Sequence, residues 1–577
     1  MHSWFNKSLK KKLENHIPAL KLILGTFGVF FTYIFSQILL IKPNGIYIGQ
    51  PNSWSDWVVH ISITNIFASK PISEWFLYHP FFAYGKLTYG FLVHLITALF
   101  IRLGFSLSEA FFIVSVLLLF FFLTGLYFLY FTLSNSRKEA ILGIFLFFTS
   151  SGMGIFRFLS LLKVTDILHP LKDYSRFVEY QWLAGNIPAA MLIPQRAFFI
   201  GVTIGVWVLN LLLWGLDQSE KNNNTVLTKL SNKLGFVTNT GQKKLLLSAG
   251  ILAGILPIAH MHSFIAISIV TGIICLFNWA KFRLLLPYFV LPATCISATL
   301  YFTFINGGIE IPDFMRLSVG WTVAKTGNIF QDIFAWKKMW LQLWGTFLPS
   351  ALFAFFLFKK NLSIKKQSAT FFGFFAVFLV ANIIIFQPTA WDNTKLFAWV
   401  YLGFSILVAK LLISLWKKSL IQKIASIILI ITLSTTGFVE LLRIVNFSPN
   451  TYLLSSSSEV LLAQEIAKKT ATDAVFLTST THNHPIPLWA NRPIFLGYLG
   501  WVRNFGFDHT VREKQLIAVF SGTAQAHKII TENKISYIFV GPKEVATMTI
   551  NTQYLQQFPI AFQNEDTTVY DTRQLWQ

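Results

Sequence analysis

An acidic and an imidazole side chain lie four residues apart in the segment Ser53–His60, at Asp56 and His60. If this segment is helical, both side chains lie on one face of the helix. Trp54 and Trp57 flank Asp56, and tryptophan is enriched at the headgroup level of membranes. The segment closely follows the first long apolar stretch of the chain. We therefore predict a reaction centre beside lipid, with Asp56 and His60 as its catalytic residues.

Asp56 also has an alternative, structural role. Ser53, Ser55 and Asp56 all suit the N-cap of a helix. A carboxylate near hydrocarbon is costly unless it is solvated or used, so catalysis is the favoured interpretation. The same loop also holds Glu74 and the histidine of a His-Pro pair, His79. Both are candidate substrate or metal ligands.

A second set of candidates lies at the ends of later apolar stretches. Gln195 and Arg196 follow Pro194 at the start of one stretch. An arginine there can grip a phosphate, helped by backbone N–H groups of a helix N-terminus, and a snorkelling anchor is the alternative. His260 and His262 lie where two stretches meet. Within one helix they would point to roughly opposite sides and could not share a metal ion, whereas in a turn they could; polar packing and substrate hydrogen bonding are the alternatives.

A third set is the run Asp392-Asn393-Thr394-Lys395, at the start of another apolar stretch. Asp392 or Asn393 can cap the helix that follows. Lys395 lies a turn inside that helix, where a charge is expensive. A cation near the positive end of a helix favours an anion at the same place. Lys395 is therefore a candidate anion-binding residue.

The composition is that of a membrane protein. Of 577 residues, 54% are hydrophobic and 12% are charged, and the mean hydropathy is +0.56, which is too apolar for a soluble globular protein. Both cysteines, Cys275 and Cys295, fall in apolar segments, which excludes a disulfide framework and a Cys-based zinc site. The net charge of +22 comes mostly from short loops between apolar stretches, where Lys and Arg set the topology. No nucleic-acid partner is expected.

Apolar runs near the length of about 20 residues that crosses a bilayer predict about eleven transmembrane helices. They cover residues 17–40, 107–131, 138–156, 190–214, 244–259, 262–280, 284–305, 339–358, 368–387, 394–415 and 420–442. A lysine-rich N-terminus in the cytoplasm puts every basic loop on the inner side, as the positive-inside rule requires. Leu87–Phe105 is also long enough to cross, but counting it would reverse everything after it. We expect it to lie on the outer face as a juxtamembrane helix, with an ordinary span as the alternative.

This topology predicts two domains. Residues 1–445 form a transmembrane module that includes an outer loop, 41–106, with juxtamembrane helices. Residues 446–577 have mixed charge, an amphipathic run and strand-like segments, and so predict an α/β domain outside the membrane. The expected fold is therefore mainly α: a polytopic helical membrane protein with a small extracytoplasmic α/β domain at its C-terminus.

The layout resembles the GT-C superfamily of integral-membrane glycosyltransferases, which includes protein mannosyltransferases, the aminoarabinose transferases of lipid A and the catalytic subunits of oligosaccharyltransferases. A first span, a large outer loop with an early aspartate, and a His-Pro element carry the resemblance over the first three hundred residues. The motifs that look like recurrent elements of bacterial members are Pro194-Gln195-Arg196, His260-Met261-His262 and Asp392-Asn393-Thr394-Lys395. The tail from Ala474 to Trp501 also looks like their outer domain. The chain lacks the Trp-Trp-Asp tail motif of oligosaccharyltransferases, which argues against transfer of a whole glycan.

The resemblance implies transfer of one sugar from a polyprenyl-phosphate donor to an acceptor hydroxyl at the outer face, normally with inversion. Asp56 stands at the position of the general base, and His60 would orient Asp56 or contact the donor. The residues that would bind the donor phosphate are Arg196, Gln195, Lys395, Asn393 and Asp392. His260 or His262 would assist by hydrogen bonding or by holding a divalent cation, Mg²⁺ or Mn²⁺.

The implied partners are the donor, membrane lipids, and a glycan, lipid or protein acceptor, in a bacterial inner membrane. The main rival function is a polytopic transporter or flippase of a lipid-linked or small polar substrate. Transporters usually show paired repeats and helices interrupted near mid-membrane, and no convincing repeat is found here. A noncatalytic scaffold with the same architecture is a third possibility.

Overall fold

The structure, a computed structural model, describes residues 14–50, 53, 55–161, 170, 172–182, 185–217, 239–358 and 365–576. These residues are mainly helical. The chain divides into two compact units. Unit 1 comprises Met1–Ser36, Ser115–Phe302 and Arg316–Pro449, and unit 2 comprises Gln37–Val114, Thr303–Met315 and Asn450–Gln577.

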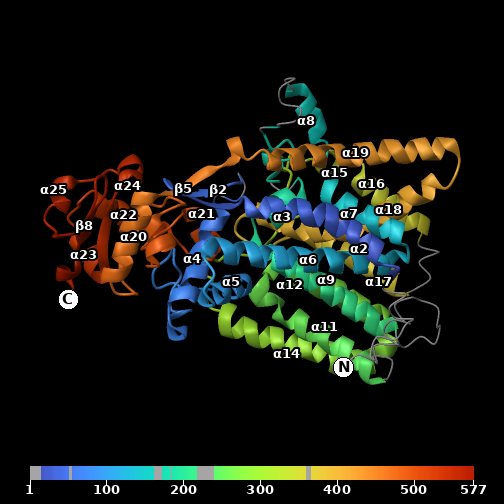
Figure 1. Ribbon diagram of the computed structural model, residues 1–577, viewed down its shortest axis with the longest axis horizontal. Helices are drawn as coiled ribbons and strands as arrows, with labels where there is room; N and C mark the ends of the chain where they lie inside the picture. The colour runs from blue at the N-terminus through green and yellow to red at the C-terminus, as the bar shows by residue number, and fades with distance from the viewer. Residues whose placement is uncertain are drawn as a thin grey trace. The chain divides into compact units, whose positions relative to one another are not determined.

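Long apolar helices make up most of unit 1, because only a segment that satisfies its own backbone hydrogen bonds can cross hydrocarbon. Seven helices in the described part of the chain are long and apolar enough to cross a membrane. They are Ile17–Ser36 (α2, η1 and α3), Leu107–Ser134 (α6), Arg196–Asp217 (α9), Thr240–Ala259 (in α11, Asn239–Ala259), Trp279–Ile305 (through α13, Phe282–Leu285, and α14, Leu291–Leu300), Ala390–Trp416 (with α18, Thr394–Trp416) and Leu420–Val445 (α19). In Figure 1, α9, α11 and α14 run alongside one another.

Bent pairs of helices raise the number of possible spans to nine among the described residues. α7 (Arg137–Thr149) and α8 (Gly154–Leu161) are bent by 50°. α15 (Ile329–Trp344) and α16 (Phe347–Phe358) are bent by 95°. Every one of the eleven predicted spans falls on a helix, but the predictions at 262–280 and 368–387 meet the shorter apolar helices α12 (Met261–Phe277) and α17 (Lys365–Ile383). The prediction of a mainly helical, polytopic membrane protein is confirmed, with seven to nine span-length helices in place of eleven.

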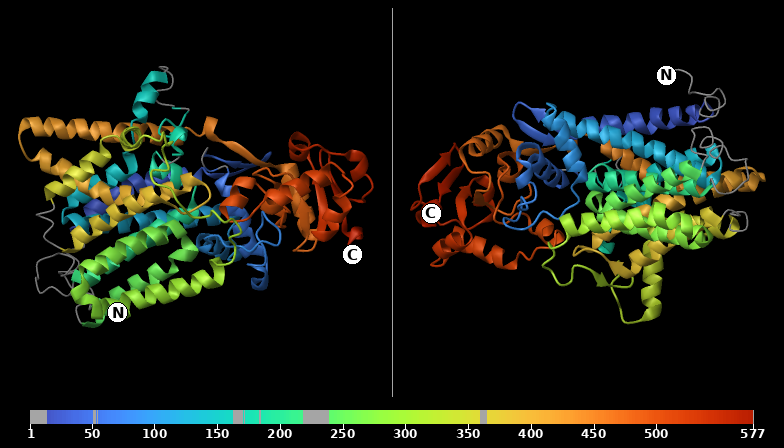
Figure 2. Two further views of the ribbon diagram at one scale, coloured as in Figure 1. Left: turned by 180° about the vertical axis from the view of Figure 1, so that it is seen from behind. Right: turned by 90° about the horizontal axis from the view of Figure 1, so that it is seen from below.

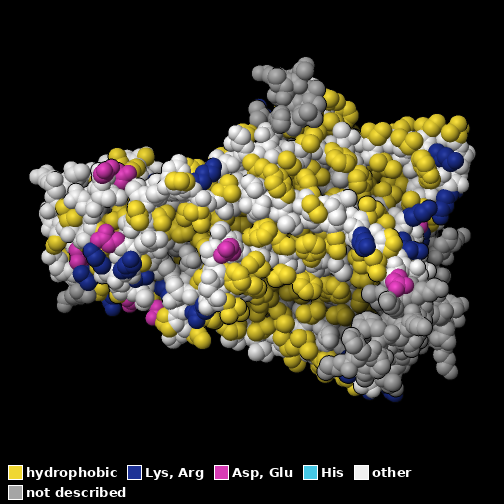
Figure 3. Space-filling model, viewed as in Figure 1, with side chains coloured by type: hydrophobic (Ala, Val, Ile, Leu, Met, Phe, Trp, Pro, Cys, Tyr) yellow, Lys and Arg dark blue, Asp and Glu magenta, His cyan; other side chains and the backbone are white. Residues whose placement is uncertain are grey.

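The helices of unit 1 differ in how deeply they are enclosed. In α18 and α9, 89% and 78% of the apolar stretch is buried, compared with 17% in the stretch Trp279–Ile305. Figure 3 shows hydrophobic side chains over most of the visible helical surface, with Lys and Arg gathered at one end of the helices. α9 and α18 therefore form the interior of unit 1, and α12 and α17 pack against α18.

Unit 2 contains two sheets and several short helices. β1 (Leu39–Lys42), β2 (Gly45–Ile48) and β5 (Tyr452–Ser456) form an antiparallel sheet in that order. The second sheet has the order β6-β7-β9-β8, with β6 (Val475–Leu477) parallel to β7 (Ile535–Val540) and the other pairs antiparallel. The remaining strands and α-helices are α4 (Asp56–Ser69), α5 (Leu92–Arg102), α20 (Ser457–Lys469), α21 (Leu499–Asn504), α22 (Thr510–Phe520), α23 (Ala526–Glu532), α24 (Pro542–Thr547), α25 (Thr552–Leu555), β8 (Ile560–Gln563) and β9 (Thr568–Asp571). Figure 2 shows these elements from two further sides.

The division into units differs from the predicted domains at the loop 41–106 and at Thr303–Met315, which both belong to unit 2. The loop 41–106 was expected to belong to the transmembrane module, but it packs with the tail in unit 2. Its strand β2 pairs with β5, and Asn65 Nδ2 of α4 donates to the carbonyl of Leu488 at 2.6 Å. Inside the stretch Leu87–Phe105, the helix α5 has 11 residues, which is too short to cross a bilayer.

Candidate functional site

Asp56 is the first residue of α4, where the positive end of a helix favours a carboxylate. The preceding residue, Ser55, occupies the N-cap position and makes no side-chain capping bond. The Asp56 side chain is half-buried. The local helix thus exists as expected, with Asp56 and His60 one turn apart on it, and Asp56 is not its N-cap.

His60 pairs with a second histidine, His94 of α5. The two rings are buried, and Nδ1 of His60 lies 2.8 Å from Nε2 of His94. One nitrogen must donate and the other accept, so the pair is held in matched tautomers. The expected headgroup contact of Trp57 is wrong: its ring is buried and lies 5.2 Å from that of Phe111, because α4 packs into unit 2 instead of facing lipid there. Trp54 lies outside the described residues.

His79 and Glu74 occupy the same unit. The ring of His79 is fully buried and its centroid is 4.4 Å from that of Phe505. Its Nδ1 accepts the backbone N–H of Phe81 at 3.2 Å, and burial lowers the pKa of His79 to about 3. The imidazole is therefore neutral at physiological pH. Oε2 of Glu74 is buried and has no hydrogen-bond partner among the described residues.

In unit 1, His260 separates α11 from α12. It adopts an extended backbone conformation, φ −166° and ψ 114°, and its Nδ1 caps α12 by accepting the N–H of Ser263 at 3.1 Å. Because His260 lies outside the helix, its ring comes within 5.6 Å of the His262 ring. The two rings are thus neighbours, as a turn allows and a continuous helix would not. Nε2 of His262 is buried and has no hydrogen-bond partner within the described residues.

Two helices that are distant in sequence, α9 and α18, meet at this turn. The ring of Phe198 in α9 lies 5.4 Å from that of His260. Trp399 Nε1 of α18 donates to Ser263 Oγ at 3.2 Å. Lys395, one turn before Trp399, lies near enough to act electrostatically on both imidazoles. We call His260, His262, Ser263, Lys395 and Trp399 the imidazole–lysine cluster.

Three residues at the start of α18 have different roles: Asp392 and Asn393 precede the helix, and Lys395 is its second residue. Lys395 Nζ forms a 2.7 Å ion pair with Asp392, and both side chains are largely buried. Asn393 Nδ2 donates to the carbonyls of Ala381 and Ile384 at 2.9 and 2.8 Å, so its amide ties the start of α18 to the end of α17. Asn393 occupies the N-cap position of α18 and makes no side-chain capping bond. Lys395 carries a partly compensated charge, and Asn393 positions its helix.

Arg196 is the first residue of α9 and is buried, so it is not a snorkelling anchor in this structure. Its guanidinium donates to Ser115 Oγ at 2.9 Å. Gln195, the residue before it, is half-buried. A buried guanidinium at a helix N-terminus within apolar surroundings is suited to hold an anion.

A shared metal ion does not fit the two imidazoles. The lone pair of His260 Nδ1 is already used by the N–H of Ser263, which leaves the proton of the neutral ring on Nε2. Only His262 then offers a free lone pair. Among the described residues, no three His, Cys, Asp or Glu side chains lie together as metal ligands would.

Several residues of these sites were not singled out in the sequence. His94, Ser263 and Trp399 are partners that only the tertiary structure reveals. Glu440 and Arg443 of α19 carried a readable signal, since two charges three residues apart interrupt an apolar run. In the structure they form a buried 2.8 Å ion pair, and Glu440 also accepts the N–H of Tyr174 at 3.0 Å.

The fold is shared with solved membrane proteins of low sequence identity. No protein-family model and no curated protein matches the sequence. The apo oligosaccharyltransferase of Archaeoglobus fulgidus superposes with a TM-score of 0.53 at 11% identity, over 92% of this chain and 70% of that one. The oligosaccharyltransferase AglB from Archaeoglobus fulgidus, in complex with an inhibitory peptide and a dolichol-phosphate, gives 0.52 at 11% over the same shares. ArnT from Cupriavidus metallidurans in the apo state gives 0.49 at 11%, over 96% and 98%. The chain therefore has the fold of the archaeal oligosaccharyltransferase, the fold that the sequence resemblance predicted.

Proposed function

We propose that this protein is a membrane glycosyltransferase that moves a single sugar from a polyprenyl-phosphate donor to an acceptor hydroxyl, with inversion. The shared fold supports this function, since AglB, solved with a dolichol-phosphate, is a transferase. The observation that carries the proposal is the imidazole–lysine cluster, a set of polar groups enclosed by apolar helices. Such groups are expensive inside a membrane protein and are a sign of function.

In the proposed step, the acceptor hydroxyl attacks the anomeric carbon of the donor sugar. Asp56 accepts the hydroxyl proton as the new C–O bond forms. The bond between the anomeric carbon and the phosphate oxygen breaks at the same time, and its electron pair stays on the phosphate. The products are the glycosylated acceptor and the polyprenyl phosphate.

The phosphate gains charge in this step, so cations near it stabilise the transition state. Lys395 and Arg196 supply the positive charge. Gln195, the residue before Arg196, donates a hydrogen bond to the phosphate. Asp392 holds the Lys395 ammonium through their 2.7 Å ion pair, and Asn393 fixes the start of α18. Asp392 and Asn393 are therefore positioning residues.

The imidazoles have supporting roles. His262 Nε2 can form a hydrogen bond with the donor, because it is buried and makes none with the described residues. His260 keeps the turn in shape by capping α12. His60 orients α4, the helix that begins with Asp56, through its bond to His94. Glu74 and His79 lie in the same unit as Asp56, and His79 acts there as a neutral packing group.

The remaining features of the proposal rest on the family resemblance and on the predicted topology. The acceptor is a glycan, lipid or protein, and the reaction takes place at the outer face of a bacterial inner membrane. The N-terminus is cytoplasmic, and the tail from residue 446 is extracytoplasmic. A divalent cation, Mg²⁺ or Mn²⁺, is not needed for the roles assigned to these side chains.

Two variants of the full chain in detergent test the proposal. Undecaprenyl phosphate should stabilise the wild type against heat, and undecaprenol, which lacks the phosphate, should not. Lys395→Met should weaken the binding of undecaprenyl phosphate by about tenfold or more, the loss of one charge-assisted hydrogen bond. Asp56→Asn should bind it normally yet lose transfer from undecaprenyl-phosphate hexoses and pentoses by about a hundredfold or more.

Full transfer by Asp56→Asn at normal expression would rule out Asp56 as the base. Equal stabilisation by undecaprenyl phosphate and undecaprenol would rule out the phosphate site. Movement of the lipid-linked sugar across vesicles without any transfer would favour a flippase instead.

A further inference from the structure

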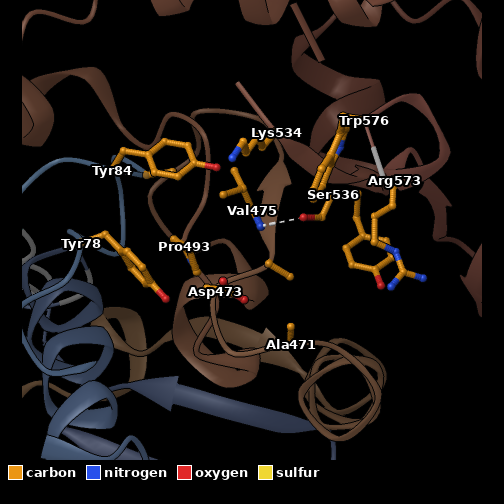
Figure 4. Close-up of a pocket in the computed structure, with 13 residues that line it drawn as sticks. Tyr78, Tyr84, Ala471, Asp473, Val475, Pro493, Lys534, Ser536, Arg573 and Trp576 are labelled. Carbon is orange, nitrogen blue, oxygen red and sulfur yellow. Dashed lines mark hydrogen bonds between the residues drawn. The ribbon is translucent and has the colours of Figure 1, made fainter. Parts of the chain in front are cut away.

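A cavity of about 390 Å³ opens in unit 2, and none of the residues assigned to the transfer step lines it. It lies beside the first residues of the parallel strands β6 and β7. Aromatic side chains and charged groups line it together, among them Tyr78, Tyr84, Asp473, Lys534, Arg573 and Trp576. Figure 4 shows Tyr84, Lys534 and Trp576 along one side and Tyr78 and Asp473 along the other.

The opposite end of the same strands is filled by protein. Ligands of α/β sheets usually bind at the carboxyl ends of parallel strands. Here Glu544 accepts the N–H of Ser479 at 2.8 Å and that of Gly541 at 3.0 Å, and it lies 3.2 Å from His484 Nε2. Glu544 and these three partners are buried. The room for a ligand is therefore at the amino ends of β6 and β7.

The polar groups of the cavity have unused hydrogen-bonding capacity. The hydroxyl of Tyr78 is buried and has no hydrogen-bond partner in the described part of the chain. In Figure 4 it points toward Asp473. The exposed side chains of Asp473 and Lys534 form no hydrogen bond or ion pair with other described residues. A buried hydroxyl left without a partner costs free energy that a ligand would return.

The rim is held in a costly backbone conformation. Tyr84 and Lys534 have φ values of 68° and 46°, in the left-handed region that long side chains rarely adopt. The Tyr84 hydroxyl donates to the carbonyl of Asn533 at 3.2 Å, which joins the loop to the turn before β7. Strain of this kind persists where the surroundings impose it, and it collects at ligand sites.

The chemistry of the lining selects among ligand classes. An apolar lipid chain would leave the charged groups of Asp473, Lys534 and Arg573, which line the cavity, without polar partners. A phosphate would be repelled by Asp473. A peptide added to the sheet would need the edge of β6. There the N–H of Phe476 already donates to the carbonyl of Pro493 at 3.1 Å, and the carbonyl of Phe476 accepts the N–H of Phe495 at 2.8 Å. A saccharide offers both apolar ring faces and many hydroxyls that donate and accept.

We propose that this cavity binds a saccharide. The aromatic rings of Tyr84 and Trp576 pack against the apolar faces of the sugar rings. Asp473 accepts from sugar hydroxyls, Lys534 donates to them, and the Tyr78 hydroxyl gains its missing partner. A volume of about 390 Å³ lies at the lower end of the range for small-molecule sites, so the ligand is a short saccharide or one end of a longer glycan.

The test is saturation-transfer NMR on the full chain in detergent, with lactose, maltose, cellobiose, chitobiose and mannobiose as probes. At least one disaccharide should receive saturation at its ring protons. Asp473→Asn should weaken that binding by about tenfold, as expected for a lost hydrogen bond to a charged group. Tyr78→Phe should weaken it several-fold. The matched control is Tyr554→Phe, which removes another buried hydroxyl without a hydrogen-bond partner among the described residues and should leave the affinity unchanged.

Lys534→Asn separates binding from stability. Asparagine tolerates the left-handed region, so this variant should melt at the same temperature as the wild type or higher while binding the sugar less tightly. The inference is wrong if no probe receives saturation from the wild type. It is also wrong if Tyr78→Phe and Tyr554→Phe bind alike. Because the residues tested lie outside the transfer machinery, either result leaves the proposed transferase function standing.

Discussion

His79 carries a stability cost that depends on pH. Burial lowers its pKa to about 3 from an ordinary value of 6.5, so the unfolded chain binds one more proton than the folded chain between these pH values. The free energy of unfolding should therefore fall as the pH drops from about 6.5 toward 3, by on the order of 5 kcal/mol in all, and should not depend on this group above pH 7. The apparent melting temperature of the full chain between pH 4 and 7.5 measures it.

His79→Asn should flatten that dependence. The Asn oxygen can accept the N–H of Phe81 as Nδ1 does, but it takes up no proton in this range. His527→Asn, at an exposed histidine of α23, is the matched control and should keep the wild-type slope. A slope equally steep in His79→Asn would show that another group controls acid unfolding.

Single candidate functional residues could be predicted from the sequence where a polar or charged side chain lies in or beside an apolar stretch. Asp56, His60, Arg196 and Lys395 stand out because charges and imidazoles are rare in apolar stretches. Their partners could not be picked out, because a contact between residues far apart leaves no local pattern. The pairing of His60 with His94 is such a contact.

At the scale of elements, Gly201 allows α9 to approach α12. A Cβ at this position would lie 2.6 Å from the His260 Cβ and 2.8 Å from Ser263 Oγ. Gly201→Ala should therefore force the helices apart at the imidazole–lysine cluster and destabilise the protein by about 1 to 3 kcal/mol. The binding of undecaprenyl phosphate should weaken with it. Melting temperature and ligand-induced stabilisation of the full chain measure the two effects.

Gly272 of α12 provides the matched control. A Cβ added there meets nothing within 4 Å, and alanine favours a helix over glycine by up to about 1 kcal/mol. Gly272→Ala should therefore be neutral or slightly stabilising. Equal effects of the two substitutions would mean that the close approach at Gly201 has no energetic importance.

Helices were the most predictable elements, because each apolar run of sufficient length has one stable form in hydrocarbon. The break between α11 and α12 was also readable, since the apolar stretch around Pro257 is too long for one crossing. The bends between α7 and α8 and between α15 and α16 were not, because they depend on what the helices pack against.

At the scale of the whole chain, unit 2 is assembled from segments separated by most of the sequence. β2, which comes soon after the first helix, pairs with β5, which follows the last long helix. The loop around Phe81 also exchanges backbone hydrogen bonds with the tail: Ala83 N–H donates to Ile494 at 3.0 Å, and Gly497 N–H donates to Phe81 at 2.8 Å. The domain boundary predicted from composition at residue 446 could not reveal these pairings, because strands that pair over such a distance share no recognisable sequence pattern.

The tail alone should therefore not fold into a stable domain. Without residues 37–114, a fragment of residues 446–577 loses the partner of β5 and leaves an unpaired strand edge, which favours aggregation. It also exposes Phe507, which stacks on Phe82 at 4.6 Å in the intact chain. We expect the fragment to give a poorly dispersed amide NMR spectrum and to be digested rapidly by protease. A chimera that joins residues 37–114 to 450–577 through a flexible linker should recover dispersion and resistance, and a fragment that is well folded by itself would contradict this account of unit 2.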